Sequence, residues 1–268
     1  MCMLLVYTYA VSARQTRYLL RDSGDGKIWW GYTNSMTESQ IRNTPAENLP
    51  RCNLLDANAF FTKYTSAMHR YTGALEDASV FIKHPNIIRH PDMGDPELPA
   101  MIKATQKREI WAAEKYRSAP HANICEYKGV ITDSRDRVIA TVYRRYTMDL
   151  RQLVVQTKFL EVLPSAPEPP LHIDYIMAAI KSGMEHIHSL GLVHCDIRPD
   201  NVFVDVDIGR VAIGDFDGTN QPGNRLDGRV ATSAVKHTKK GIVGFYVDVG
   251  LVKEIENWLK ECRKRAKT

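Results

Sequence analysis

The amino-acid sequence predicts a mixed α+β fold, because patterns typical of strands and of helices follow one another along the chain. Residues 79–85 form a short apolar run that ends at a proline, which is typical of a buried strand. Between residues 173 and 187, apolar side chains recur at intervals of three and four, which predicts an amphipathic helix. With 268 residues, of which 44% are hydrophobic, the chain is long enough for one large domain or two small lobes.

The composition limits the classes of function. The formal net charge is +5, but much of the basic excess lies in short clusters such as residues 263–265, which favours a solvated surface over a nucleic-acid groove. No run approaches the roughly 18 apolar residues that span a bilayer, so no membrane role is expected. Residues 1–13 faintly resemble a signal peptide but lack a basic start, so secretion is not favoured.

The cysteines indicate a reducing compartment. They lie far apart in the sequence and form no Cys-x-x-Cys pair, so neither a zinc site nor a disulfide framework is indicated. We therefore expect the protein in the cytoplasm or the nucleus. The five are Cys2, Cys52, Cys125, Cys195 and Cys262.

The first part of the chain offers few clear elements. Residues 1–50 show no clear periodicity, and we interpret them as a variable extension of unknown role. Lys83 is the one charged residue of the predicted strand over 79–85. Taken alone, a lysine at a strand end is most often exposed to solvent. Any importance of Lys83 depends on an anionic partner.

Residues 98–117 predict a helix whose periodicity separates two acidic residues. Glu114 falls beside Lys103 and Lys107, away from the apolar stripe. Glu109 falls on the stripe and is the better candidate for an inward-facing carboxylate, with a solvated carboxylate as the alternative. The stripe consists of Ile102, Glu109, Ala113 and Tyr116.

A hairpin is predicted next, because residues 127–131 and 137–143 are strand-like and flank a turn-rich segment. Residues 144–150 form a possible connection between lobes. A short amphipathic piece follows at 150–160, and the proline-rich segment 163–170 predicts a surface loop.

The amphipathic helix over 173–187 is expected to end near Gly191, which suits the position just past a helix C-terminus. We interpret its apolar residues as core, with no role in cofactor binding. Two short strands are expected at 201–204 and 210–213.

The loop 191–204 concentrates polar side chains between this helix and the first of these strands, namely His194, Asp196, Arg198, Asp200 and Asn201. A polar turn alone could account for them. However, Asp215 directly follows the second strand, so Asp196, Asn201 and Asp215 could converge on one point. Three oxygen-bearing side chains can hold Mg²⁺, which leaves its other positions to water and phosphate. Such a group suits phosphoryl transfer.

These motifs resemble those of the eukaryotic protein kinase family over about residues 52–260. The pattern His-x-Asp-x-x-x-x-Asn is present from His194 to Asn201, and Asp215-Phe216 matches the start of the Asp-Phe-Gly motif. Residues 80–83 match the Val-Ala-Ile-Lys strand, 121–124 resemble the turn after the C helix, and residues 248–251 resemble the start of the long helix of the large lobe. The Asp-Phe-Asp motif resembles that of a group of kinase-like proteins in fungi.

The resemblance implies a two-lobed α+β fold. A small β-rich N-lobe would occupy residues 52–146, and a mainly helical, shortened C-lobe would occupy residues 147–268. Residues 1–51 would precede both lobes as the extension. The expected partner is an unidentified protein substrate, whereas no nucleic acid and no membrane is expected; the oligomeric state is left open.

The resemblance also implies a role for each residue of the loop. Asp196 would accept or orient the proton of the substrate hydroxyl. Arg198 would take the place of the catalytic-loop lysine on the γ-phosphate. Asn201 and Asp215 would bind Mg²⁺.

On the nucleotide side, the resemblance implies ATP as cofactor. Lys83 would hold the α- and β-phosphates and would be braced by Glu109. The connection from Tyr143 to Tyr146 would contact adenine through its backbone.

The sequence departs from the family pattern at several points. No Gly-x-Gly-x-x-Gly precedes Lys83, since the region 53–73 has only Gly73. Cys195 replaces the arginine beside the catalytic aspartate, so control through a phosphorylated activation loop is not expected. No Ala-Pro-Glu follows Asp215, and twenty residues follow Asp248.

Three functions therefore stay open. A protein kinase-like phosphotransferase acting on serine or threonine is favoured, because the polar groups needed at the γ-phosphate are present. A pseudokinase or scaffold is the second reading, because the glycine-rich loop is absent. A small-molecule phosphotransferase of the aminoglycoside or choline kinase type is the third, suggested by Asp217.

Overall fold

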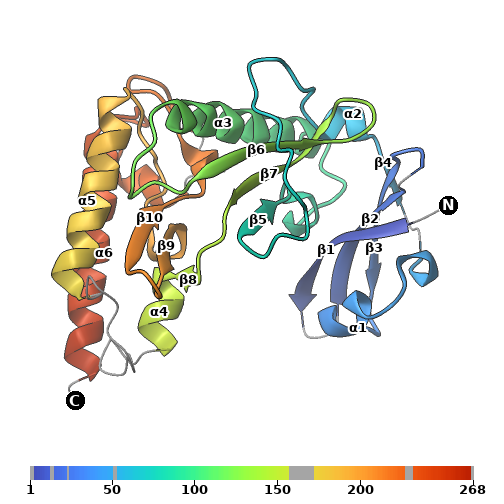
Figure 1. Cartoon of the computed structure of the whole chain (residues 1–268), viewed down its shortest axis with the longest axis horizontal. Coiled ribbons are helices and arrows are strands. Elements are labelled where there is room, and N and C mark those ends of the chain that lie inside the picture. The colour runs from blue at the N-terminus through green and yellow to red at the C-terminus, as the bar shows by residue number, and fades with distance from the viewer. Residues whose placement is uncertain are drawn as a thin grey trace. The chain divides into compact units, whose positions relative to one another are not determined.

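The computed structural model describes residues 3–12, 15–22, 24–50, 53–156, 172–226 and 232–266 (Figure 1). The predicted loop at 163–170 and residues 157–160 of the predicted amphipathic piece lie outside the described residues. The chain forms two compact units. Unit 1 comprises Met1–Thr72, Ile82–Lys107 and Gly129–Val142, and unit 2 comprises Gly73–Phe81, Arg108–Lys128 and Tyr143–Thr268. Within the described ranges, no helix has the length and apolar character needed to cross a membrane.

Unit 1 begins with a four-stranded antiparallel sheet in the order β1-β2-β3-β4, seen as the blue arrows in Figure 1. Its strands are β1 (Met3–Ser12), β2 (Gln15–Asp22), β3 (Ile28–Thr33) and β4 (Asn53–Leu55). Helix α1 (Glu38–Arg42) follows β3 and starts with a capping box between Thr37 and Gln40. Residues 1–50 show no clear periodicity in the sequence, and strands β1, β2 and β3 with helix α1 correct the expectation of a segment without regular elements.

Strand β2 is buried on both faces, which explains why the sequence shows no alternation of polar and apolar residues there. Tyr18 and Leu20 of β2 pack with Ile41 and Leu49 on one face. Leu19, between them in sequence, belongs to a second cluster on the other face. Successive residues of a strand point to opposite faces, so a strand buried on both sides shows a continuous apolar run instead of alternation.

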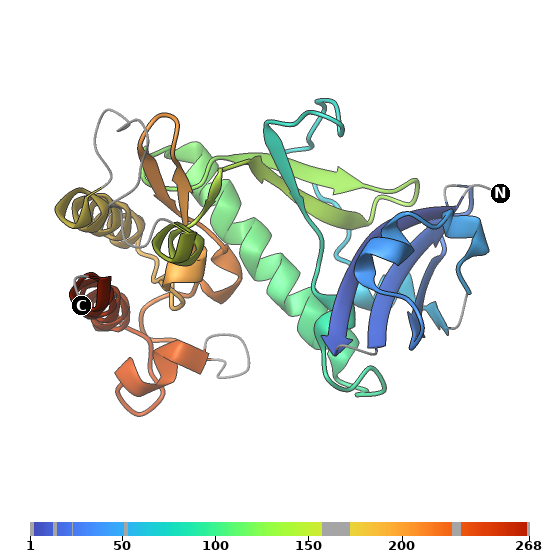
Figure 2. The same cartoon turned by 90° about the horizontal axis from the view of Figure 1, so that it is seen from below.

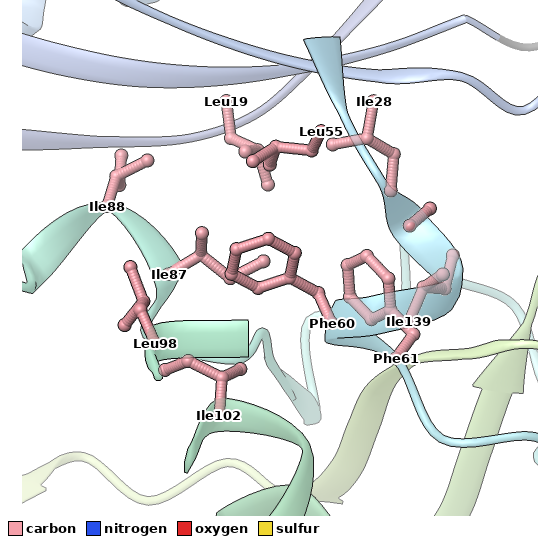
Figure 3. Packing of buried hydrophobic residues seen from close by; sticks show 11 residues of the cluster. Leu19, Ile28, Leu55, Phe60, Phe61, Ile87, Ile88, Leu98, Ile102 and Ile139 are labelled. Atoms are coloured by element: carbon pink, nitrogen blue, oxygen red, sulfur yellow. The ribbon is translucent and has the colours of Figure 1, made fainter. Parts of the chain in front are cut away.

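The second cluster joins the sheet to the start of helix α3 (Leu98–Ser118). Figure 3 shows Leu19, Ile28 and Leu55 facing the aromatic side chains and the isoleucines of later segments. The remaining members come from helix α2 (Ala57–Phe60), the 3-10 helix η2 (Ile87–Arg89), α3 and the hairpin, and they are Ala57, Phe60, Phe61, Ile87, Ile88, Leu98, Ile102 and Ile139. Residues 3–55 therefore share a core with the segment that precedes α3.

A second sheet has the strand order β5-β7-β6. Its strands are β5 (Val80–Lys83), β6 (Tyr127–Thr132) and β7 (Val138–Arg144), which confirms the predicted strand and the predicted hairpin. Helix α3 confirms the helix predicted over 98–117. The division between the two units runs through α3 and through these three strands.

Unit 2 carries the remaining elements. They are β8 (Met148–Asp149), α4 (Leu150–Gln156), α5 (Ile173–Ser189), β9 (Val202–Asp205), β10 (Arg210–Ile213) and α6 (Tyr246–Ala266), with short 3-10 helices at η3 (Pro199–Asn201), η4 (Phe216–Gly218) and η5 (Thr232–His237). The sheet order is β10-β9-β8. Helices α5 and α6 lie side by side in both views (Figures 1 and 2).

The end of α5 confirms the prediction made for Gly191. The glycine has a φ of 70°, and its N–H donates to the carbonyl of His188 at 2.9 Å. The next N–H, that of Leu192, donates to the carbonyl of Ile187 at 3.2 Å. This pair of bonds is a Schellman motif, which satisfies the last helical carbonyls and turns the chain into the loop that follows.

Candidate active site

The loop between α5 and β9 is held in place by Asp248, a fully buried residue of α6. Its Oδ2 accepts the N–H of His194 at 2.8 Å, and its Oδ1 accepts the N–H of Cys195 at 2.8 Å. His188 Nε2 also bonds to Oδ2 at 2.9 Å. A buried carboxylate is tolerated when donors surround it in this way. These bonds hold Cys195 in the left-handed region, at a φ of 64°, which non-glycine residues rarely adopt.

Asp196 and Asn201 are brought together, as the spacing predicted. Asn201 Nδ2 donates to Asp196 Oδ2 at 2.8 Å and to the carbonyl of Asp196 at 3.0 Å. Ser233, in η5, donates its hydroxyl to Asp196 Oδ1 at 2.6 Å. Both carboxylate oxygens therefore have a donor, which orients Asp196.

The position of Asp215 is set through the residue before it. Gly214 donates its N–H to the carbonyl of Asn201 at 2.9 Å, and its own carbonyl bonds to His194 Nε2 at 3.1 Å. Asp215 follows with a φ of 63°, so the chain turns sharply at the end of β10. A side chain at Gly214 would meet Cys125 Sγ at 2.7 Å, so glycine is required for this approach.

Phe216 anchors the turn that follows Asp215. Its ring is fully buried and lies 4.6 Å from the ring of Tyr116, 5.8 Å from that of His194 and 6.0 Å from that of Tyr143, measured between centroids. Arg108 of α3 donates Nε to the carbonyl of Asp217 at 2.6 Å. The Asp-Phe-Asp turn is therefore bonded to α3 and packed against His194 of the loop 191–204.

Glu109 is 6% exposed and faces inward, as the helical periodicity predicted. Tyr143 donates its hydroxyl to Glu109 Oε1 at 2.9 Å. Burial, together with the nearby Glu109 carboxylate, raises the pKa of Tyr143 well above its ordinary value, so the hydroxyl stays protonated and can donate. The sequence analysis gave Tyr143 only a backbone role, and this side-chain bond is an addition to it.

The other predicted nucleotide residues are placed as follows. Tyr146 packs its ring on Phe203, with 6.2 Å between centroids. Lys83 lies at the end of β5 in unit 1, whereas Glu109 lies in unit 2. The pairing of Lys83 with Glu109 stays a prediction.

Arg198 has a carboxylate partner of its own in this structure. Its guanidinium bonds to Asp200 Oδ2 at 3.0 Å. Arg151 of α4 holds both oxygens of the same carboxylate, at 2.8 and 2.9 Å. The hydrogen bonds from Arg151, and then the charge of Arg198, lower the pKa of Asp200 to about 2. A contact of Arg198 with phosphate would require it to exchange this partner.

Two residues that hold the loop 191–204, Asp248 and Ser233, were not predicted as site residues from the sequence. In the sequence, Asp248 was interpreted only as the start of a helix. Its position on the apolar face of that helix could have indicated a buried carboxylate. Ser233 gave no local signal, because its contact with Asp196 joins residues 37 positions apart.

The donor set fits a magnesium ion. The Asn201 amide donates both of its hydrogen bonds to Asp196 from Nδ2, so its carbonyl oxygen is the atom to offer a cation. The Asp215 carboxylate is a second hard oxygen donor, and Mg²⁺ is bound by one or two such groups together with phosphate and water.

Part of the chain is similar in sequence to known proteins. The family model described as "Protein kinase domain" matches residues 96–237, just over half of the chain. A probable serine/threonine-protein kinase of fowlpox virus (strain NVSL), FPV226, is 33% identical over 99 residues, which are 37% of this chain and 32% of that protein. Protein kinase MCK1 of Saccharomyces cerevisiae is 33% identical over 103 residues, which are 37% of this chain and 27% of that protein.

The matched segment thus spans about a third or less of these curated relatives. Among solved structures, the yeast RNA polymerase II CTD kinase CTDK-1 complex is similar at 21% identity and a TM-score of 0.38, over 55% of this chain and 40% of that chain. The family match includes every predicted site residue except Lys83, which lies before it.

Proposed function

The chain belongs to the protein kinase family, and on this basis we propose that it transfers the γ-phosphoryl group of ATP to a serine or threonine hydroxyl of a protein. The observation that carries the proposal is the 2.6 Å bond from Ser233 Oγ to Asp196 Oδ1. An alcohol reaches this carboxylate at the distance that proton transfer from a substrate hydroxyl needs. The relative in fowlpox virus is named as a probable serine/threonine-protein kinase, which supports the same class of acceptor.

In the proposed reaction, Asp196 receives the proton of the substrate hydroxyl while the oxygen attacks the γ-phosphorus of ATP. The bond from the γ-phosphorus to the β–γ bridging oxygen breaks, and ADP leaves. Asn201 supports this role because it fixes the second carboxylate oxygen at 2.8 Å. Asn201 and Asp215 would hold the magnesium ion, which neutralises charge on the transferred phosphate. Arg198 would add positive charge there after leaving Asp200.

On the nucleotide side, Lys83 would contact the α- and β-phosphates, and the backbone from Tyr143 to Tyr146 would contact adenine. Glu109 would orient Lys83. The bond from Tyr143 supports this role, because it fixes the orientation of the Glu109 carboxylate.

A non-catalytic scaffold that binds nucleotide weakly is the second candidate. The ion pair between Arg198 and Asp200 favours it, because the cation expected on the γ-phosphate is already neutralised. The small-molecule phosphotransferase has no contact in the described structure that favours it over the protein kinase.

The first prediction concerns the metal. We expect Asp215→Ala to abolish binding of Mg-ATP, because the carboxylate is the only charged group proposed to bind the ion. Isothermal titration of Mg-ATP into the wild type and the variant measures this. Asp207→Ala, in the exposed turn between β9 and β10, is the matched control. Equal affinity of wild type and Asp215→Ala would remove Asp215 from the site.

A transfer assay then separates the candidate functions. Radiolabelled ATP is offered with generic protein and with aminoglycoside or choline acceptors, and Asp196→Asn is the inactive control. Label on protein supports the kinase, and label only on small molecules supports the third reading. Binding of Mg-ATP without transfer supports the scaffold.

A further inference from the structure

The β1–β2 hairpin of unit 1 bonds to the segment that links β5 to α3. Arg17 of β2 donates NH1 to the carbonyls of Ile88 at 3.3 Å and His90 at 2.6 Å, and NH2 to that of Pro91 at 3.3 Å. One guanidinium thus binds three carbonyl oxygens of one short segment.

Tyr7 of β1 adds two bonds to the same segment. Its hydroxyl donates to the carbonyl of Pro85 at 2.8 Å and accepts the N–H of Ile88 at 3.1 Å. Burial raises the pKa of Tyr7 to about 12, so the hydroxyl remains a donor at neutral pH. The ring also stacks on that of His84, with 6.0 Å between centroids.

These bonds matter because most of residues 84–97 lie outside regular secondary structure, where only η2 interrupts the irregular backbone. The backbone groups of such a segment need partners outside it. A planar guanidinium with five donors suits several carbonyls at once, and a lysine could not replace it.

An apolar contact supports the same attachment. Leu19 lies two residues after Arg17 on β2 and therefore points to the same face. In Figure 3, Leu19 lies on the side of the cluster toward Ile87 and Ile88, and Leu98, the first residue of α3, belongs to the same cluster. The sheet therefore holds residues 84–97, the linker between β5 and α3, through hydrogen bonds and through apolar burial.

The linker begins directly after Lys83, which lies two residues before Pro85. A change in the linker would therefore displace Lys83.

We infer that Arg17 and Tyr7 are positioning residues for nucleotide binding, acting through the linker on Lys83. In this role, the N-terminal sheet fixes the position of Lys83 by holding the linker that follows it. This inference rests on the proposed function, because it assumes that Lys83 contacts the phosphates.

A double-mutant cycle tests the inference. Mg-ATP affinity is measured by titration for the wild type, Arg17→Ala, Lys83→Met and the double variant, at a temperature where circular dichroism finds all four folded. We expect Arg17→Ala to weaken binding by about threefold to thirtyfold, the range in which residues outside a site alter it through a shared element. In the Lys83→Met background, Arg17→Ala should have no further effect.

Tyr7→Phe provides a second, milder variant that keeps the ring and removes the hydroxyl, in case Arg17→Ala fails to fold. Its effect should also vanish in the Lys83→Met background. The matched controls are Arg42→Ala, on the exposed side of α1, and Tyr32→Phe, on β3 with 47% of its surface exposed. Both controls should bind Mg-ATP as the wild type does.

Three results would overturn the inference. Equal losses from Arg17→Ala with and without Lys83 would mean a general structural role. Unchanged affinity of Arg17→Ala and Tyr7→Phe, with a weakened Lys83→Met, would remove the positioning role and leave the proposed function intact. Unchanged affinity of Lys83→Met would overturn both the nucleotide role of Lys83 and this inference.

Discussion

Asp200 shows how two cations on one carboxylate determine its protonation. Arg151 of α4 binds both of its oxygens. Arg198, two residues before Asp200, binds one of them. Its pKa falls to about 2, first through the hydrogen bonds from Arg151. Because the side chain is 36% exposed, solvent screens much of this interaction, and its contribution to stability is small.

The pH dependence of this contribution has a definite sign. The folded pKa is lower than the ordinary value of 3.8, so the stabilisation is present above pH 4 and is lost as the pH falls toward 2. We expect Asp200→Asn to lower the free energy of unfolding at pH 7 by about 0.5–1 kcal/mol. The variant should also lose less stability than the wild type between about pH 4 and pH 2.

Urea denaturation at a series of pH values measures both effects. Asp207→Asn is the control, since it removes a carboxylate from the exposed turn between β9 and β10. If the wild type and Asp200→Asn lost stability in parallel over the acid range, the ion pairs would contribute nothing in solution.

At the scale of elements, the sequence predicted best those whose pattern is local. The spacing of apolar residues and Gly191 predicted α5 and its end, and short apolar runs predicted β5, β9 and β10. Asp196 and Asn201 could be paired in advance because the five-residue spacing lies within one loop. Strand β2 was missed because burial on both of its faces removes the alternation of polar and apolar residues.

Contacts between distant segments could not be predicted for a different reason. Ser233 reaches Asp196, and Tyr143 reaches Glu109, only after the intervening elements have packed. Arg17 bonds to carbonyls more than 70 positions away, and backbone carbonyls carry no residue-specific signal in a sequence. The roles of these side chains became visible only with the fold.

Helix α5 offers a test of packing between elements. Gly183 is buried within α5, and an added Cβ would lie 2.6 Å from the backbone oxygen of Asn123 and 3.1 Å from Ile213 Cδ1. Alanine is normally better than glycine in a helix by about 1 kcal/mol. Here we expect the clash to exceed this gain, so Gly183→Ala should destabilise the protein by about 1–3 kcal/mol.

Chemical denaturation of Gly183→Ala measures the change. Lys181→Ala on the same helix is the control, because the lysine side chain is 51% exposed and its replacement should alter stability little. A Gly183→Ala protein more stable than the wild type would mean that α5 does not approach the segment at Asn123 so closely.

At the scale of the whole chain, the structure gives residues 1–50 a structural role in unit 1. The sequence suggested a variable extension before two lobes, and the lobe boundaries at 51 and 146 stay predictions. The structure forms two compact units that are discontinuous in sequence, and residues 3–50 pack within unit 1. Because its residues belong to two buried clusters, one on each face of the sheet, this segment is an integral part of its unit.

A chain lacking residues 1–50 should therefore fail to fold cooperatively. The deletion removes Leu19 and Ile28 and exposes their partners, including Phe60, Ile87 and Ile88. Each buried apolar side chain of this size contributes about 1.5–3 kcal/mol, so losing several approaches the 5–15 kcal/mol that stabilises a typical protein. We expect the shortened chain to aggregate, or to bind a hydrophobic dye without a cooperative thermal transition. A soluble product that melts cooperatively at the temperature of the full chain would show that the N-terminal sheet is a dispensable addition.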